Sequence, residues 1–346
     1  MKKSILYKNK IFYKVIFLIT NLIDINKNNK KWKLGLIFIL CLVFSLLLTN
    51  NSNKFGINYI NVAYAFDNYY YYITHVSMKS IMLSQKNNTF IKFYILVWKN
   101  IYEEQKPIID KICIEHKNCN ITYLKLKNEF KEISTKGIIK RTTAIFYRLL
   151  LQNLLPKEKK ILYFDCDIVV YKDLNELYNY NNYNKYYIGQ YEGKPLKKYG
   201  NKLKDFINSG AILINLELLR KDNIFQKIYQ FLKVNNGSLL FLDQDVINVV
   251  CNKKNGFFPS YYFGSFLCSW KNISKINKLA LNKNHIIQNI KEPYLYHFKK
   301  FVKPWYGIAR NKDNMICFDF ITRFYEFAKK SSYYFEILEK FKVFMK

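Results

Sequence analysis

The sequence predicts an α/β domain with a doubly wound, mostly parallel sheet. From residue 59 onward, short apolar runs that are typical of strands alternate with longer amphipathic stretches that are typical of helices. This order builds a parallel sheet with helices on both faces. A second observation agrees with it. Asp67 follows one predicted strand and Asp165 follows another, and sheets of this class bind their ligands at the carboxyl ends of the strands.

The strands and helices are expected in alternation along the chain. The strands are short and rich in β-branched and aromatic residues, and we expect them at residues 60–65, 91–98, 121–126, 161–164 and 211–215. The helices have apolar residues at helical spacing, and we expect them at residues 73–85, 141–155, 218–234 and 241–251. The helix at 141–155 ends before Pro156, because proline cannot continue a helix. The basic, aromatic tail at 318–346 is predicted to be helical as well.

Changes in composition divide the chain into three segments. Residues 1–57 hold a lysine-rich start, an apolar helix and a polar linker, residues 58–310 form the α/β domain, and residues 311–346 form the C-terminal tail. The apolar helix is expected at residues 34–48 and would span about 22 Å, less than the roughly 30 Å of a bilayer's hydrocarbon core. We interpret it as a membrane-associated helix, either a short anchor or an interfacial helix. A helix buried in the protein is the alternative.

The net charge of +31 indicates anionic partners. Hydrophobic residues make up 50% of the chain and aromatic residues 18%, which excludes a wholly disordered protein. Nucleotide phosphates, nucleic acid and an anionic membrane surface would all be such partners. The alternative is that a genome rich in A and T encodes many lysines that have no function. No basic stripe interleaved with stacking aromatic residues stands out, so nucleic acid is not an expected partner. A membrane surface is an expected partner.

The seven cysteines form no metal-binding framework. Most are expected to be buried thiols in a reducing compartment. The alternative for Cys113 and Cys119 is that they pair in an oxidising one.

The most informative stretch is residues 161–170, where an apolar run ends in two acids and then becomes apolar again. A buried charge needs a partner. Strand alternation points Asp165 and Asp167 to the same side, where both can reach one divalent ion. The alternative is a charged loop after a core strand, so the motif depends on partners elsewhere in the chain.

Such partners appear as a set of motifs in a fixed order. They are residues 61–67, 142–150, 162–167, 207–215 and 243–248, and the segment from His297 through Lys303-Pro304-Trp305. Together they resemble glycosyltransferase family 8, which includes bacterial lipopolysaccharide galactosyl- and glucosyltransferases and glycogenin. The resemblance covers about residues 58–310. It implies a GT-A fold, a UDP-sugar donor, a Mn²⁺ or Mg²⁺ ion, and transfer with retention of anomeric configuration.

The resemblance also implies a role for each matching residue. Asp165, Asp167 and His297 would bind the metal ion, and Asp165 would contact the ribose as well. Lys303 would contact the diphosphate. Asp67 would face the uracil, with Asn68 beside it where the family usually has a second acid or amide.

Four further residues are expected around the donor sugar and the acceptor. Arg148 would orient the donor sugar, and the pocket would be lined by Asn208, Asp243 and Gln244. Alternative roles stay open: Asp243 can cap a helix, Arg148 can form a structural ion pair, and His297 can be a core histidine. Glu192, in a predicted loop, is a candidate acceptor contact or a solvated acid. Lys300 replaces a glycine of the family's pattern, which would either alter the backbone's approach to the diphosphate or add a positive charge there.

The chemistry of sugar transfer requires these residue types independently of the family resemblance. Departure of UDP places negative charge on the β-phosphate, which a divalent ion and a lysine can stabilise. Carboxylate oxygens suit Mn²⁺ or Mg²⁺, and one imidazole shifts the preference toward Mn²⁺. The amide oxygen of Gln244 can help an oxocarbenium-like sugar. Because a neutral amide is a poor nucleophile, front-face attack is favoured over a covalent intermediate, and the leaving phosphate would take the acceptor's proton.

The expected function is transfer of glucose or galactose from a UDP-sugar to a glycan or a lipid-linked saccharide. Two alternatives remain. In a haloacid-dehalogenase-type phosphatase, Asp165 would be the nucleophile and Asp167 the acid. In a non-catalytic protein, a transferase scaffold would bind glycans or anionic lipid. The catalytic domain is expected at the cytoplasmic face of the inner membrane, with a type II Golgi-like anchor as the alternative.

Overall fold

The computed structural model of the chain describes residues 56–98, 102–127, 129–136, 142–181, 183–193, 205–264, 293–299, 303–306 and 318–341. Residues Ile57–Lys346 form one compact unit, which contains every described helix and strand. The predicted apolar helix at residues 34–48 lies outside the described residues, so the division into three segments stays a prediction. In the described part of the chain, no helix is long and apolar enough to span a membrane.

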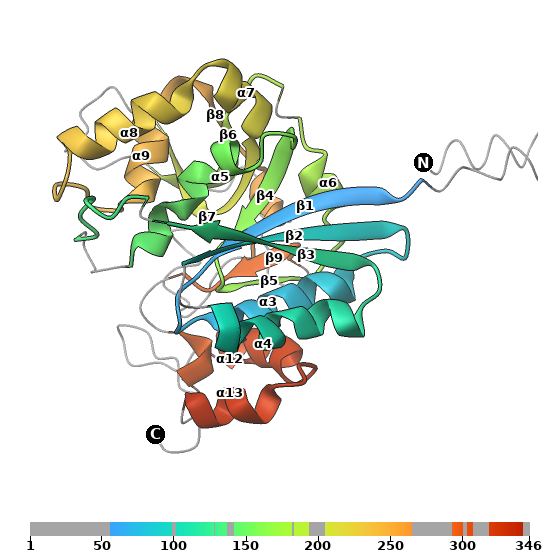
Figure 1. Cartoon of the computed structure of the whole chain (residues 1–346). Helices are drawn as coiled ribbons and strands as arrows, with labels where there is room; N and C mark the ends of the chain where they lie inside the picture. Colours follow the sequence, from blue (N-terminus) through green and yellow to red (C-terminus); the bar gives the residue numbers. More distant parts are fainter. Residues whose placement is uncertain are drawn as a thin grey trace, which may run out of the picture. The chain divides into compact units, whose positions relative to one another are not determined.

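A mixed, mostly parallel sheet of seven strands forms the centre of this unit (Figure 1). Its strands, in spatial order, are β3 (Cys119–Leu126), β2 (Thr89–Trp98), β1 (Asn58–Ala65), β4 (Lys160–Phe164), β7 (Phe206–Asn215), β6 (Tyr187–Gly193) and β8 (Asn255–Phe257). All neighbours are parallel except that β7 runs antiparallel to both β4 and β6. The predicted α/β class and mostly parallel sheet are therefore confirmed, with one strand reversed.

Both faces of the sheet are buried under helices. Successive residues of β1 alternate between two apolar clusters, with Val62 and Tyr64 in one and Ala63 in the other. The first cluster includes Met78 and Ile109, which come from α3 (Tyr71–Ser84) and α4 (Tyr102–Glu115). Helices on the opposite face supply the second: η1 (Thr143–Leu150), α5 (Leu151–Leu154), α7 (Leu216–Lys221), α8 (Ile224–Val234) and α9 (Asp243–Val250). Burial on both faces explains why β1 is apolar throughout its second half.

A second, two-stranded sheet brings the far end of the chain to the end of β4. Its strands are β5 (Ile168–Val170) and β9 (Leu295–His297), and Ile168 pairs with His297. The C-terminal helices α12 (Phe318–Ala328) and α13 (Tyr334–Lys340) pack beside it, in a third apolar cluster that includes Trp305. Figure 1 shows α12 and α13 below α3 and α4. Four short elements complete the described fold: α6 (Asn175–Tyr178), η3 (Asn252–Lys254), η4 (Ser260–Tyr262) and η5 (Pro304–Tyr306).

Two helix predictions are wrong in detail. Residues 141–155 do not form one α-helix, because η1 has the tighter 3₁₀ winding and only α5 is α-helical. Residues 146–150 are all buried, so this stretch is not an amphipathic helix with one exposed face. The predicted helix at 218–234 is two helices, α7 and α8. Asn223 between them has a φ of 50°, a left-handed conformation that asparagine tolerates.

Four strands were not predicted. Glu192, expected in a loop, lies in β6. The strands β5, β8 and β9 have three residues each, which is too short to show any alternation of apolar and polar residues.

The four cysteines that the structure describes divide into two kinds. Cys113, in the last turn of α4, forms a disulfide with Cys119, the first residue of β3. The expectation of buried thiols is therefore wrong for this pair and holds for Cys166 and Cys251, which are buried and reduced. The close approach of α4 and β3 across a six-residue separation places the two sulfur atoms together.

Candidate functional site

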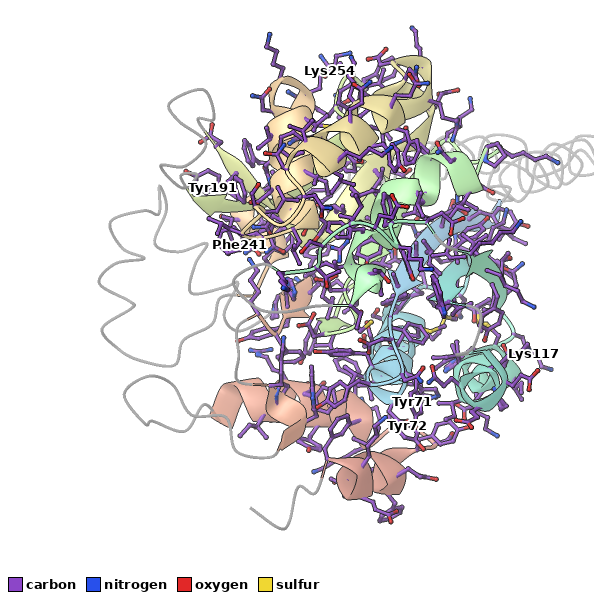
Figure 2. All side chains as sticks on the ribbon, turned by 60° about the vertical axis from the view of Figure 1, so that its left-hand side comes forward. Tyr71, Tyr72, Lys117, Tyr191, Phe241 and Lys254 are labelled. Atoms are coloured by element: carbon purple, nitrogen blue, oxygen red, sulfur yellow. A yellow bond between two sulfur atoms is a disulfide. The ribbon has the colours of Figure 1, made fainter. Side chains whose placement is uncertain are left out.

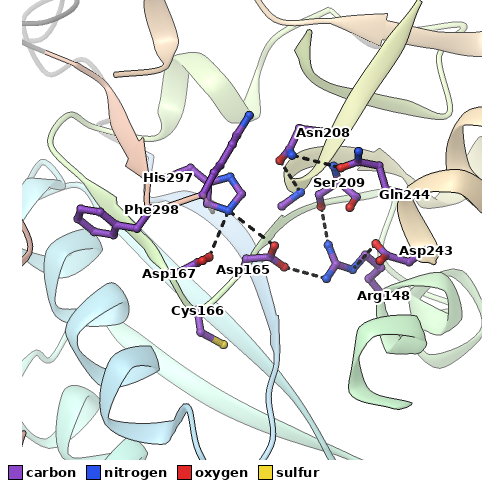
Figure 3. A network of polar contacts seen from close by, with 12 residues as sticks. Arg148, Asp165, Cys166, Asp167, Asn208, Ser209, Asp243, Gln244, His297 and Phe298 are labelled. Atoms are coloured by element: carbon purple, nitrogen blue, oxygen red, sulfur yellow. Dashed lines mark hydrogen bonds and ion pairs between the residues drawn. The ribbon is translucent and has the colours of Figure 1, made fainter. Parts of the chain in front are cut away.

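Asp165, Asp167 and His297 converge at the end of β4. The backbone N–H of Asp165 donates a hydrogen bond to the Gly210 carbonyl (2.7 Å), which fixes the turn that follows the strand. His297 Nε2 lies 3.2 Å from Asp167 Oδ1 and 3.8 Å from Asp165 Oδ2. One ligand atom from each of the three residues lies within 4.8 Å of the others. This geometry allows all three to bind a single divalent ion (Figure 3).

The pairing of β5 with β9 explains the convergence. Asp167 immediately precedes β5, and His297 is the last residue of β9, opposite Ile168. The N–H of Phe298 then donates to the Asp167 carbonyl (2.9 Å) and closes the ladder. The register therefore places the imidazole beside the carboxylate although the two residues are far apart in the chain.

Asp167 is buried and charged. Burial alone would raise the pKa of its carboxyl, but Lys303 and His297 outweigh burial and hold that pKa below its usual range. Lys303 Nζ donates to Asp167 Oδ2 and to the Phe298 carbonyl (2.8 Å). Asp167 Oδ1 and His297 Nδ1 are buried, and neither has a hydrogen-bond partner among the described residues. A buried carboxylate oxygen that is left without a donor beside an imidazole fits a metal ligand.

Arg148 is a buried bridge between two carboxylates. Its Nη2 donates to Asp165 Oδ1 (2.7 Å), and its Nη1 donates to the Ser209 carbonyl (2.6 Å). Its Nε lies 3.2 Å from Asp243 Oδ2. The guanidinium carbon also lies 4.2 Å from the centre of the Tyr163 ring. Arg148 therefore positions the metal-site carboxylate relative to the start of α9 (Figure 3).

Asp243 and Arg148 each change the pKa of the other. Burial raises the pKa of Asp243 to about 6, although the charge of Arg148 opposes this rise. Burial would lower the pKa of Arg148, but Asp165 and Asp243 raise it overall. The alternative role of Asp243 as a helix cap does not account for these contacts. Asp243 is the first residue of α9, and its side chain faces Arg148.

Gln244 and Asn208 form a second network at the site. Gln244 Oε1 accepts hydrogen bonds from Asn208 Nδ2 (3.2 Å) and from the N–H of Ser209 (3.2 Å). Asn208 Oδ1 accepts from the N–H of Gly210 (3.0 Å). A carbonyl oxygen has two lone pairs, so stabilisation of a sugar cation by this oxygen requires the network to rearrange. That role of Gln244 stays a prediction.

A cavity of about 470 Å³ opens beside the acids. The residues that line it include Asp67, Tyr70, Arg148, Asp165, Asp167 and Lys303. The side-chain carboxylate of Asp67 accepts hydrogen bonds from the N–H of Tyr69 (3.0 Å) and from Thr142 Oγ1 (3.2 Å).

Most of the predicted site residues therefore belong to one connected arrangement. Asn68 is the exception. It is not among the residues that line the cavity, and its side-chain oxygen accepts a hydrogen bond from Gln105 Nε2 (3.0 Å). Its role in nucleotide binding stays a prediction that these contacts do not favour.

Two contributors were missed by sequence reasoning. Ser209 supplies a backbone carbonyl to Arg148 and a backbone N–H to Gln244. Gly210 allows the metal-site side chains to approach its backbone, because a Cβ there would lie 2.2 Å from His297 Cε1. The signal was available in part, since both residues follow Asn208 in the motif at 207–215.

Arg148→Met tests the bridge. We expect it to lower the free energy of unfolding by about 3–5 kcal/mol, because it leaves the Asp165 and Asp243 carboxylates without their buried counter-charge. Urea denaturation measures the change. Asp243→Asn in the same background should recover part of the loss, since it removes one unpaired charge. If the two substitutions destabilise additively, Arg148 and Asp243 do not interact.

Comparison with known proteins identifies the family. Residues 61–309 match the family described as Glycosyl transferase family 8. The chain belongs to this family. The matched region contains every predicted site residue, from Asp67 to Lys303. The chain is therefore a glycosyltransferase, and family membership favours sugar transfer over the phosphatase alternative.

Related sequences include a protein that is named as a glycosyltransferase. A Haemophilus influenzae protein named "Putative glycosyltransferase" is 27% identical over 249 residues, which cover 70% of this chain and 74% of the relative. General stress protein A of Bacillus subtilis is 25% identical over 179 residues, which cover 47% of this chain and 59% of the relative.

Solved structures show the fold. The apo structure of the bifunctional glycosyltransferase WbbM matches with a TM-score of 0.64 and 19% identity over 82% of this chain, which spans about half (52%) of the WbbM chain. Galactosyltransferase LgtC, solved with donor and acceptor sugar analogues, matches with a TM-score of 0.62 and 18% identity, over 79% of this chain and 96% of LgtC. The family 8 chain thus resembles GT-A glycosyltransferases in fold.

Proposed function

We propose that this family 8 protein transfers a hexose, glucose or galactose, from a UDP-sugar to a glycan or lipid-linked saccharide, with a divalent metal ion and with retention of configuration. The observation that carries the proposal is the convergence of Asp165, Asp167 and His297 beside a cavity of about 470 Å³. A cavity of this size suits a small-molecule ligand. Two carboxylates and one imidazole suit Mn²⁺ better than Mg²⁺.

Two of the residues that line the cavity are candidate partners for different parts of a nucleotide diphosphate. Asp67 is the candidate partner of the uracil, and Lys303 is the candidate partner of the diphosphate. In the structure Lys303 is bound to Asp167 and to the Phe298 carbonyl. We propose that Lys303 exchanges Asp167 for phosphate oxygens when the donor binds, because the metal ion then neutralises that carboxylate.

A bound divalent ion would stabilise the negative charge that develops on the departing diphosphate. The protein's own residues prepare the site for this. Arg148 holds Asp165 in place through a buried ion pair, and Lys303 adds a second positive charge beside the cavity. Because the Arg148–Asp165 ion pair is in place before the donor arrives, little reorganisation of this pair is needed during the reaction.

We propose front-face attack for the transfer step. Asp243 is engaged by Arg148, and Gln244 is a neutral amide, so neither is a good nucleophile in this arrangement. The acceptor hydroxyl would then attack from the side of the leaving group, and the leaving phosphate would take its proton. Asn208 and Gln244 would position the sugar and the acceptor.

A donor-hydrolysis screen tests the proposal. UDP-glucose, UDP-galactose and UDP-N-acetylglucosamine are incubated with the purified full-length protein, with and without Mn²⁺, and UDP release is measured. We expect release from UDP-glucose or UDP-galactose that requires the metal ion and stops when EDTA is added. Binding of membranes or glycans without any binding of UDP or Mn²⁺ would instead support the non-catalytic alternative.

We further propose that residues 34–48 attach the enzyme to a membrane at its cytoplasmic face, beside a lipid-linked acceptor. The Cys113–Cys119 disulfide favours the alternative, a type II anchor with the catalytic domain in an oxidising compartment. Protease accessibility in intact cells or spheroplasts distinguishes the two. Cleavage from outside would overturn the cytoplasmic location.

A further inference from the structure

Four consecutive tyrosines connect the end of β1 to the first turn of α3. The turn begins at Asp67, whose carbonyl accepts a hydrogen bond from the N–H of Tyr70 (3.1 Å). Asp67 and Tyr70 both line the cavity. Tyr71 and Tyr72 begin α3 and lie between that helix and the C-terminal helices (Figure 2). The conformation of residues 67–72, here called the tyrosine turn, therefore shapes part of the cavity wall.

Lys340, the last residue of α13, lies among the rings of this turn. Its Nζ is 3.9 Å from the centre of the Tyr71 ring, 5.4 Å from that of Tyr72 and 5.8 Å from that of Tyr69. The same atom lies 3.5 Å from the Asn68 carbonyl, which accepts its hydrogen bond across 272 residues of sequence. A lysine ammonium over aromatic faces is attracted by the negative face of each ring. One side chain thus contacts four residues of the turn, Asn68, Tyr69, Tyr71 and Tyr72.

The residue after Lys340 extends this contact to the segment of Lys303, which also lines the cavity. Phe341 packs edge-on against Tyr69, with 5.6 Å between ring centres, and lies 6.2 Å from the Trp305 ring. Trp305 is fully buried, also contacts Tyr70 (6.0 Å), and follows Lys303 by two residues. The end of α13 is therefore packed against both the tyrosine turn and the segment that carries Lys303.

We propose that Lys340 is a positioning residue of the donor pocket, which holds the tyrosine turn in the conformation that binds the uridine end of the donor. The inference rests on the proposed function, since it names a UDP-sugar as the ligand. Lys340 is not among the residues that line the cavity, so it acts through the turn and not by touching the donor. It makes the C-terminal helix a part of donor binding.

Lys340→Met tests this role in the full-length protein. The substitution keeps much of the aliphatic stem and removes the charge and the hydrogen bond. We expect the Kd of UDP, measured by calorimetry with Mn²⁺, and the KM for the donor to rise about fivefold to tenfold. We expect kcat to stay within about twofold, because the metal site is not altered. Lys340→Arg keeps the cation and should restore most of the affinity.

Lys330→Met is the matched control. Lys330 also lies over an aromatic ring of the C-terminal helices, that of Phe327 (5.7 Å), but it has no contact with the tyrosine turn among its described interactions. We expect it to leave the Kd of UDP unchanged. Tyr71→Leu supplies a second variant. It should weaken UDP binding. Lys340→Met in the Tyr71→Leu background should then weaken it little further, because the ring closest to Lys340 is already absent.

The outcomes separate the inference from the proposed function. A wild-type protein that does not bind UDP would overturn the proposed function and this role with it. A wild-type protein that binds UDP, with an equal Kd for Lys340→Met, would overturn the role of Lys340 alone. A loss of kcat at unchanged Kd would do the same.

Discussion

Asp167→Asn is expected to abolish turnover while the protein stays folded. The substitution keeps the shape of the side chain but removes the charge that faces His297 Nε2 (3.2 Å) and Lys303. Without this carboxylate the site has one acid and one imidazole, which is too few ligands to hold a divalent ion firmly. We expect donor hydrolysis to fall by at least about 10³-fold, which corresponds to roughly 4 kcal/mol of transition-state stabilisation.

Measurement of Mn²⁺ binding alongside turnover makes this test specific. The Kd of Mn²⁺, followed by electron paramagnetic resonance, should rise in parallel with the loss of activity, while circular dichroism shows a cooperative thermal transition. Asp110→Asn is the control, because Asp110 pairs with Lys106 on α4 and lies outside the site. It should behave like the wild type. Unchanged turnover in Asp167→Asn would refute the proposed metal role.

Gly210→Ala is expected to disable the site by displacing its ligands. A Cβ at this position would lie 2.2 Å from His297 Cε1 and 2.6 Å from Asp165 Oδ2, closer than any real contact of this kind. Both side chains must move, and displacement of reacting groups by about 1 Å costs on the order of 10²-fold in rate. We expect kcat/KM for donor hydrolysis to fall by about that factor, with weaker Mn²⁺ binding.

Gly256→Ala is the matched control for this substitution. A Cβ at Gly256 would meet Ile188 Cγ1 and Lys185 Cγ at 3.3 Å, and the lysine stem can move away. The variant should retain most of its activity. If Gly210→Ala also retained full activity and Mn²⁺ affinity, Asp165 and His297 would not need their observed positions, and the shared metal site would be the wrong description.

Several parts of this fold were readable from local patterns. Val62 and Ala63 belong to a strand that is buried on both faces, and such a strand appears in the sequence as a continuous apolar run. Asp165 directly follows another apolar strand, β4, and Asp167 comes two residues later, so chain continuity alone places both near its end. The motif order led to family 8, which the match over residues 61–309 confirms.

Other parts were hidden because they depend on distant contacts. The three-residue strands β5 and β9 carry no periodicity, yet their pairing puts His297 opposite Ile168. The 3₁₀ winding of η1 replaces the expected α-helix, and no local signal in the sequence marks it. The bond between Lys340 and the Asn68 carbonyl joins residues separated by 272 positions, and a sequence pattern cannot reveal such an approach.

The sequence by itself determined the fold class, the family and the chemical types available at the site, because strand and helix periodicity and motif order are properties of neighbouring residues. Only the tertiary structure decided which atoms meet. It joined the imidazole to the two acids, engaged Arg148 with both Asp165 and Asp243, and packed the end of α13 against the tyrosine turn. These contacts arise from strand register and from apolar packing between distant segments, which no local stretch of the chain encodes.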